Sequence, residues 1–179
     1  MQTEIIIAGF GGQGVLFGGQ LLAYAGLDEG KHVTWIPAYG PEMRGGTANC
    51  TAIISDEEIG SPFVQYPTAV VAMNRPSLDK YEDKVKPGGL LVVNSSMLDR
   101  AVNRTDIKVV EVDAGTISEK LGDKRMTNMV LLGALLANLP VLPLTAIENA
   151  LKVHLPERHL RLLPKNYEAL REGAKYKLN

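Results

Sequence analysis

The residues best suited to chemistry are three glycines, Gly9, Gly11 and Gly14, which follow an apolar run at residues 5–8. A β-branched run of this kind is typical of a buried strand, and the small and apolar residues from Val15 onwards are typical of a helix packed against a sheet. The glycines therefore belong to a strand-to-helix turn. Because the first turn of a helix has unpaired backbone N–H groups and partial positive charge, this turn is suited to binding a phosphate.

The same glycines match the dinucleotide-binding fingerprint, which also requires an acidic residue for the ribose about 20 residues further on. The second predicted strand, residues 32–37, is followed by residues 38–40, which contain no Asp or Glu. Asp28 and Glu29 precede that strand and belong to the end of the helix. The sequence therefore disfavours NAD. A phosphate-bearing ligand held without the ribose contact and a turn that serves only close helix packing are both open alternatives.

Length and composition indicate one globular domain covering residues 1–179. Apolar residues make up 45% and charged residues 22%, and 19 basic against 20 acidic residues give a formal charge of −1. This balance gives no electrostatic case for nucleic acid or an anionic membrane as a partner. The first residues lack the features of a signal peptide, and no apolar run is long enough to span a bilayer. We therefore expect a cytoplasmic protein with no membrane partner.

Cysteine and histidine content bounds the metal chemistry. Cys50 is the one cysteine, so the chain cannot supply the thiolates of an iron–sulfur cluster. His32, His154 and His159 show no metal-ligand spacing. We expect no metal site on this chain, and Cys50, inside a predicted strand, is expected to be a small buried apolar residue.

The remaining pattern predicts an α/β fold. It predicts strands at 5–8, 32–37, 48–54, 68–73, 90–93 and 108–112, and helices at 14–28, 77–85, 117–121, 127–138, 145–154 and 164–177. The first strand, helix and second strand form a crossover with parallel strands, whereas residues 38–47 are too short for another helical crossover, so strand 48–54 is antiparallel. Gly30 is placed to end the first helix, and Thr145 with Glu148 fits a capping box. We predict a three-layer Rossmann-like domain with a mixed, mostly parallel sheet.

Ligands of such sheets bind beyond the carboxyl ends of the parallel strands. This rim lacks an evident acid–base pair or activated nucleophile, so we assign no catalytic residue to the chain. Arg44, between glycines, could bind a phosphate or carboxylate, or pair with Glu42 or a partner subunit. Tyr39 could stack on a ligand or cover the core edge. Asn74 and Asp113 could each bind a ligand or cap the helix that follows.

These segments together resemble the gamma subunit of 2-oxoacid:ferredoxin oxidoreductases. The resemblance rests on residues 7–15, 39–48, 54–57 and 94–96, on Asn128, Met129 and Gly133, and on Asn166, Ala169 and Gly173. It covers nearly the whole chain. The glycine turn alone would be weak evidence, but its coupling to the loop at 39–48 makes the resemblance specific.

The resemblance implies a subunit of a cytoplasmic hetero-oligomer that oxidatively decarboxylates a 2-oxoacid to acyl-CoA and CO₂ and reduces ferredoxin. It implies partner alpha and beta subunits that hold thiamine diphosphate, and iron–sulfur clusters on a ferredoxin-like subunit or domain. It associates the gamma chain with assembly and with coenzyme A. Together with the rim, it gives the predicted coenzyme-binding residues: Gly9, Gly11, Gly12, Gln13, Gly14, Tyr39, Arg44, Gly45, Gly46, Thr47 and Asn74.

Two other functions are weighed against this one. A stand-alone module that binds a nucleotide or a CoA ester would use the same turn without a catalytic complex. A nicotinamide dehydrogenase is disfavoured by the missing ribose acid and the missing acid–base pair.

Overall fold

The β-branched runs form one six-stranded sheet in the computed structural model, which describes residues 1–40 and 46–178. The strands are β1 (Gln2–Phe10), β2 (His32–Tyr39), β3 (Thr47–Ser55), β4 (Ala69–Ala72), β5 (Leu90–Asn94) and β6 (Lys108–Val112). Their order across the sheet is β2-β3-β1-β4-β5-β6. β3 is antiparallel to both of its neighbours, and the other pairings are parallel. The predicted mixed, mostly parallel sheet is confirmed.

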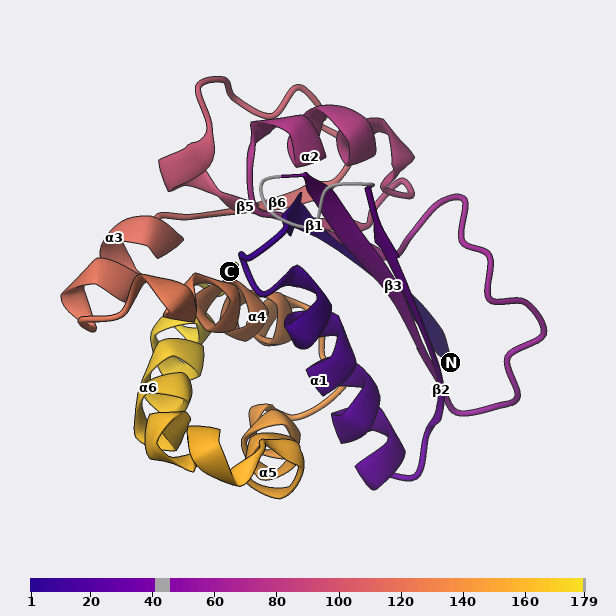
Figure 1. The fold of residues 1–179 in the computed structure, drawn as a ribbon. Helices are drawn as coiled ribbons and strands as arrows, with labels where there is room; N and C mark the ends of the chain where they lie inside the picture. Colours follow the sequence, from indigo (N-terminus) through magenta and orange to yellow (C-terminus); the bar gives the residue numbers. More distant parts are fainter. Residues whose placement is uncertain (41–45, 179) are drawn as a thin grey trace.

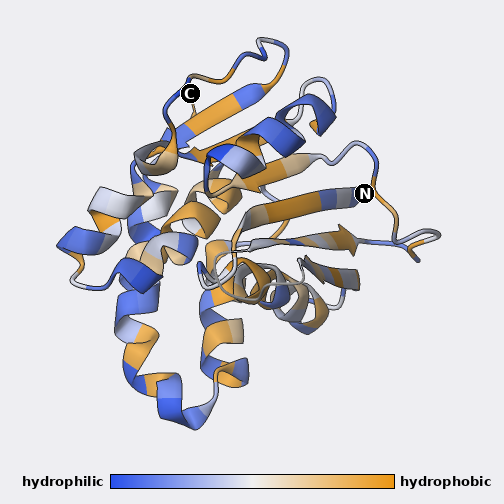
Figure 2. Ribbon diagram, turned by 45° about the horizontal axis from the view of Figure 1, so that its top comes forward, coloured by the Kyte–Doolittle hydropathy of each residue, from blue (hydrophilic) through white to orange (hydrophobic). Residues whose placement is uncertain are grey.

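Alternate residues of the central strands face two different helical layers. The helices are α1 (Val15–Asp28), α2 (Arg75–Tyr81), α3 (Ala114–Lys120), α4 (Thr127–Asn138), α5 (Leu144–His154) and α6 (Leu163–Ala174). Ile5 and Ile7 pack in a large core with α1, α4, α5 and α6, whereas Ile6 and Ala8 pack in a smaller core with α2 on the other face. Figure 1 shows the two layers, and Figure 2 shows the apolar central strands between them. The three-layer prediction is therefore confirmed.

Two glycines bring α4 and α6 into backbone contact. A Cβ on Gly133 would lie 2.0 Å from the carbonyl oxygen of Leu170, and one on Gly173 would lie 1.8 Å from that of Val130. No side chain fits between the helices at these points. The close approach explains why both positions carry glycine.

The order of strands differs from the expected crossover in one respect. β2 runs parallel to β1, but β3 lies between them. The short loop before β3 does produce an antiparallel strand, as predicted, and that strand takes the place beside β1. Gly30, at a φ of 73°, follows the end of α1 in the left-handed conformation that was expected of it.

The predicted capping box is wrong. α5 begins at Leu144, after Pro143 at the N-cap, so Thr145 lies inside the helix, and no side chain in the described part of the chain caps α5. Glu148 instead accepts a hydrogen bond from Arg171 Nε at 2.9 Å.

α2 and α3 begin earlier than predicted, at Arg75 and Ala114. Among the described residues, no helix is long and apolar enough to cross a membrane.

Candidate functional site

The candidate site lies beyond the carboxyl ends of two adjacent strands whose following helices pack on opposite faces of the sheet. β1 leads into α1 on one face, and its neighbour β4 leads into α2 on the opposite face. The carboxyl ends of such a strand pair leave a crevice, which is the usual ligand position in an open α/β sheet. The glycine turn follows β1 and Asn74 follows β4, so both predicted segments border the crevice.

The glycines form the strand-to-helix turn that the sequence predicts, between β1 and α1. Gly12 and Gly14 have φ angles of 95° and 75°, a region that side chains other than glycine rarely adopt. Gly14 also packs closely, because a Cβ there would lie 2.3 Å from Asn128 Nδ2. Asn128 Nδ2 donates to the carbonyl oxygen of Gly14 at 3.2 Å. Asn128, noted in the sequence only as part of the family resemblance, therefore holds the start of α1.

The N-terminus of α1 is open to a ligand. Gly14 is its N-cap, no described side chain caps it, and its first turn contains no acidic residue. The unpaired N–H groups of that first turn, with the partial positive charge of the helix end, can bind an anion.

Gly46 and Thr47, at the start of β3, lie beside the glycine turn. Gly11 N donates to Gly46 O at 2.8 Å, and Thr47 pairs with Phe10 across the β1–β3 ladder. Gly46 and Thr47 are thereby brought beside the turn, as the coupling of the two motifs predicts. Arg44 and Gly45 lie outside the described residues, so their contacts stay a prediction.

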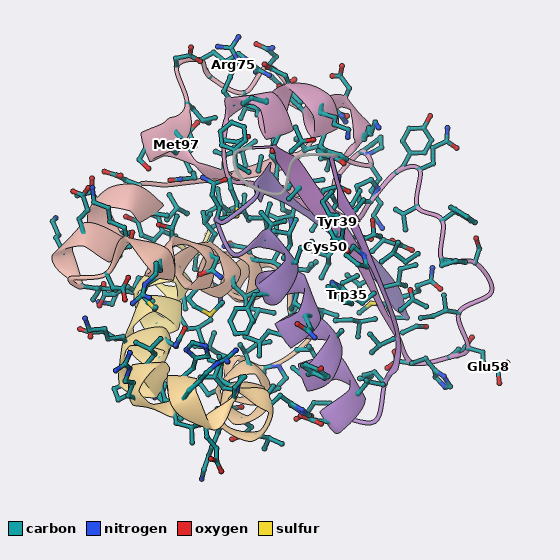
Figure 3. All side chains as sticks on the ribbon, viewed as in Figure 1. Trp35, Tyr39, Cys50, Glu58, Arg75 and Met97 are labelled. Carbon is teal, nitrogen blue, oxygen red and sulfur yellow. The ribbon has the colours of Figure 1, made fainter. Side chains whose placement is uncertain are left out.

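Two cavities meet at the turn. The first, the edge cavity, has about 310 Å³ and is lined by apolar residues and by Gly11, Gly12, Gly14 and Tyr39. Tyr39 is 55% exposed at the end of β2 (Figure 3). The second, the carboxyl-end cavity, has about 470 Å³ and lies beyond β4 and β5, with Gly12 and Gln13 in its wall. Gly12 lines both cavities, so one extended ligand could occupy them together.

The structure gives Asn74 and Asp113 capping roles, which were one of the two alternatives for each. Asn74 is 1% exposed, and its Oδ1 accepts from Ser77 N at 3.0 Å at the start of α2. Asp113 Oδ1 accepts from Thr116 N at 3.2 Å at the start of α3. Gly9 packs against Gln13 and Met73 and, like Asn74 and Thr47, is not part of either cavity wall. A direct ligand contact of these residues stays a prediction.

The far wall of the carboxyl-end cavity is polar. It is built by Ser96, Thr116, Ser118, Lys124, Arg125 and Thr127. Ser96 was noted in the sequence within the resemblance at residues 94–96, whereas the other five were missed, because they follow the edge strand β6 through α3 and reach the crevice only by tertiary packing. Lys124 Nζ pairs with Glu119 at 2.7 Å, and Arg125 Nη2 pairs with Asp123 at 2.7 Å. Both cationic side chains at this cavity are therefore already paired with carboxylates of the same chain.

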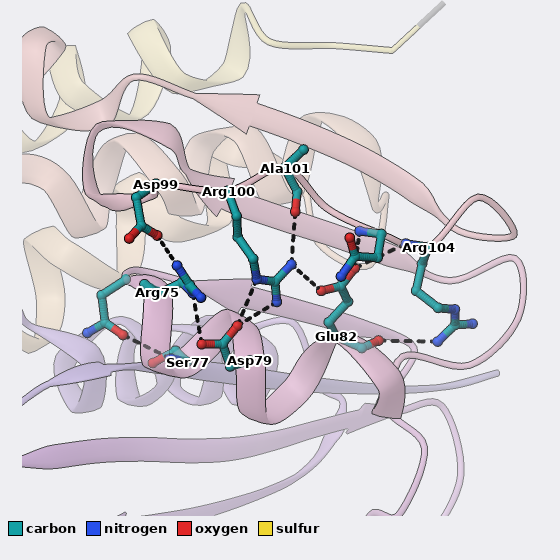
Figure 4. Close-up of polar contacts among 10 residues, drawn as sticks. Arg75, Ser77, Asp79, Glu82, Asp99, Arg100, Ala101 and Arg104 are labelled. Atoms are coloured by element: carbon teal, nitrogen blue, oxygen red, sulfur yellow. Dashed lines mark hydrogen bonds and ion pairs between the residues drawn. The ribbon is translucent and has the colours of Figure 1, made fainter.

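An ion-pair network beside α2 holds the segment that brings Ser96 and Met97 to the cavity (Figure 4). Arg100 Nη1 pairs with Glu82 at 2.8 Å and its Nη2 with Asp79 at 2.6 Å, while Arg75 pairs with both Asp79 and Asp99.

Glu82 is 3% exposed and anchors that network. Its carboxylate also accepts from the backbone N–H groups of Asn103 and Arg104. Burial acts to raise the pKa of Glu82, but the bonds from Arg100 and these two N–H groups outweigh it and hold the pKa below its ordinary value. The network thus fixes the loop between β5 and β6 against α2.

Cys50 is a packing residue, as predicted. It lies on β3, is fully buried against α1 beside Trp35, and its Sγ lies 3.5 Å from Val15 O (Figure 3). Burial raises the pKa of the thiol to about 11. The thiolate is therefore not available near neutral pH. Within residues 1–40 and 46–178, no group of three or more His, Cys, Asp or Glu side chains could hold a metal ion.

Comparison with protein families gives one match over most of the chain. Residues 4–176 match the family described as pyruvate ferredoxin/flavodoxin oxidoreductase. The KorC subunit of 2-oxoglutarate synthase from Methanothermobacter marburgensis is 38% identical, over 98% of this chain and 100% of its own. The ketoisovalerate oxidoreductase subunit VorA from Methanothermobacter thermautotrophicus is 44% identical over 76% of this chain, which spans only 28% of VorA.

Solved structures agree with the fold. The gamma subunit of the keto/oxoacid ferredoxin oxidoreductase from Geobacter sulfurreducens superposes with a TM-score of 0.81 at 30% identity, over 97% of both chains. The 2-oxoglutarate:ferredoxin oxidoreductase from Magnetococcus marinus, solved with 2-oxoglutarate, coenzyme A and succinyl-CoA bound, has a TM-score of 0.88 at 22% identity. This chain covers 31% of that one, and at this identity the likeness concerns the fold alone.

Proposed function

The chain belongs to the pyruvate ferredoxin/flavodoxin oxidoreductase family, and we propose that it serves as the gamma subunit of a 2-oxoacid:ferredoxin oxidoreductase. The observation that carries this proposal is the match to KorC along essentially the full length of both chains. We take residues 1–179 as one gamma-type domain, in agreement with the family match over residues 4–176. A stand-alone binding module is not favoured, because the relatives are named as subunits of oxidoreductases.

In this proposal the bond-breaking steps occur on other chains. Alpha and beta subunits hold thiamine diphosphate and decarboxylate the 2-oxoacid, and a ferredoxin-like subunit or domain carries the iron–sulfur clusters that pass electrons to ferredoxin. The complex acts in the cytoplasm. This chain, with one buried cysteine, contributes to assembly and to binding of coenzyme A, the acceptor of the acyl group.

The geometry of the glycine turn fits coenzyme A. The N–H groups at the start of α1 would hold a phosphate, with Arg44 as the added cation. Apolar residues predominate in the wall of the edge cavity, residues with polar side chains predominate in the wall of the carboxyl-end cavity, and Gly12 lines both. A coenzyme with a charged nucleotide and a long, weakly polar arm would use both environments.

The same geometry argues against a nicotinamide dehydrogenase. A ribose acid belongs at the end of the strand adjacent to β1, but β3 occupies that position and runs antiparallel. At about 4.8 Å per strand, β2 lies roughly 10 Å from β1. Tyr39, at the end of β2, is exposed and not acidic.

The proposal is tested by purifying the native complex and measuring 2-oxoacid-dependent and CoA-dependent reduction of ferredoxin. We expect the chain to co-purify with thiamine- and iron-containing subunits and its removal to abolish the activity. Recovery of the chain alone, with no effect of its removal, would contradict the proposal.

Arg44→Ala tests the coenzyme role. We expect the KM for CoA to rise about tenfold or more while thiamine binding is unchanged, because a charge-assisted contact contributes about 1.5–3 kcal/mol. Arg161→Ala is the matched control, since Arg161 is an exposed arginine that lines neither cavity at the turn. An unchanged KM for CoA in Arg44→Ala would move Arg44 to a structural or interface role.

A further inference from the structure

We propose that the side-chain amide of Gln13 is held in one orientation and presents its N–H groups to the carboxyl-end cavity, so that the cavity selects a hydrogen-bond acceptor of the coenzyme. This inference rests on the proposed function, since the ligand is taken to be coenzyme A. It goes further by assigning Gln13 the role of a hydrogen-bond donor towards the ligand.

The orientation is set first at the start of α2. The backbone N–H of Ser77 can only donate, and it donates to Asn74 Oδ1 at 3.0 Å. The other end of the Asn74 amide is therefore the Nδ2 group. Nδ2 donates to Gln13 Oε1 at 3.3 Å, across the crevice between β4 and β1. Asn74 is 1% exposed, so water does not compete for these contacts.

A second backbone donor fixes Gln13 from the other side. The N–H of Phe10 donates to Gln13 Oε1 at 2.7 Å. Because a backbone N–H requires an acceptor, this contact defines which end of the amide is oxygen. Gly9 leaves the space for it, since a Cβ there would lie 2.7 Å from Oε1. Oε1 thus receives two hydrogen bonds inside the turn, and Nε2 is the end left for the cavity that Gln13 lines.

Three of the four hydroxyl groups across the cavity are already used as donors. Ser96 Oγ donates to Asn94 Oδ1 at 2.7 Å, Ser118 Oγ donates to Ala114 O at 2.6 Å, and Thr127 Oγ1 donates to Lys124 O at 2.9 Å. Gln13 Nε2 has no acceptor among the residues that the structure describes. An oriented amide with two N–H groups matches a phosphate oxygen or an amide carbonyl, and coenzyme A has both.

Gln13→Glu tests the assignment in the full chain. A glutamate keeps an oxygen for Phe10 N–H and Asn74, so the turn is retained, but it replaces the N–H groups by a second anionic oxygen. We expect affinity for CoA by calorimetry to fall about tenfold or more, as for the loss of a charge-assisted bond, while the thermal midpoint stays within about 2 °C. Gln20→Glu is the matched control, because Gln20 lies on α1, the helix that follows the turn, donates to Tyr24 and lines neither cavity at the turn.

Two fragments of the coenzyme distinguish the sources of the acceptor. If Gln13 contacts a phosphate, Gln13→Glu loses affinity for 3′,5′-ADP and not for pantetheine, and if it contacts an amide carbonyl, the pattern is reversed. Equal affinity of Gln13→Glu and wild type for CoA and both fragments overturns the inference, as does absence of binding by wild type. Neither result decides the proposed function, which depends on co-purification and on CoA-dependent ferredoxin reduction by the complex.

Discussion

Gly14→Ala is the substitution for which the structure predicts a two-part loss of stability. The first part is backbone strain, because Gly14 has a φ of 75° and a non-glycine residue there loses about 1–2 kcal/mol. The second part is the contact with Asn128, whose Nδ2 would lie 2.3 Å from the new Cβ.

Asn128 cannot move without loss. It is 9% exposed, its Nδ2 donates to Gly14 O at 3.2 Å, and its Oδ1 accepts from Met129 N at 2.9 Å. Displacing the side chain breaks or weakens these two bonds, each of which contributes about 1 kcal/mol. We therefore expect Gly14→Ala to lower the free energy of unfolding by about 2–4 kcal/mol, which corresponds to a fall of roughly 5–15 °C in Tm.

A double-mutant cycle separates the two parts. Asn128→Ala removes the obstacle, so Gly14→Ala in that background should lose only the backbone part, and the cycle should give a coupling energy of about 1–2 kcal/mol. Gly12→Ala is the matched control, since its φ of 95° carries strain but no atom of the described residues lies within 4 Å of its added Cβ. Urea unfolding followed by the fluorescence of Trp35, the one tryptophan, measures all four variants. Additive losses, with Gly14→Ala no worse than Gly12→Ala, would refute the role given to Asn128.

Three further outcomes are expected. Gly133→Ala should lower the free energy of unfolding by about 3 kcal/mol or more in urea, because its Cβ would meet Leu170 O at 2.0 Å and force α4 from α6; wild-type stability would contradict the close contact. Cys50, buried and with its pKa raised to about 11, should react with a thiol reagent at pH 8 in urea but not in the native chain. The hydrogen bond from Arg125 lowers the pKa of Asp123 to about 2, so its contribution to stability is present above about pH 4 and lost as pH falls towards 2; Asp123→Asn should flatten that part of the pH profile of Tm.

Most of the fold could be predicted from the sequence because the patterns that determine its strands and helices are local. The run before Gly9 and the small residues after Gly14 predict β1, the turn and α1, and the short loop before β3 predicts its antiparallel direction. The place of β3 between β1 and β2 could not be read in the same way, because it depends on which strand edge is free when the sheet assembles. The capping box at Thr145 failed because α5 begins at Leu144, one residue before the predicted start, with Pro143 at the N-cap, and because Glu148 accepts from Arg171.

The candidate site shows where sequence reasoning reaches its limit. Gln13 and Asn74 could be named from the sequence, but an amide can donate or accept, and their roles depend on a partner 61 residues away. The direction of the chain of bonds is fixed by two backbone N–H groups, those of Ser77 and Phe10, which have no alternative role. The hydrogen bond that caps α2 therefore also determines which end of the Gln13 amide faces the cavity. A substitution that keeps the cap but removes the donor, Asn74→Asp, should leave α2 intact and still weaken coenzyme binding, because Gln13 then loses one of the two bonds that orient it.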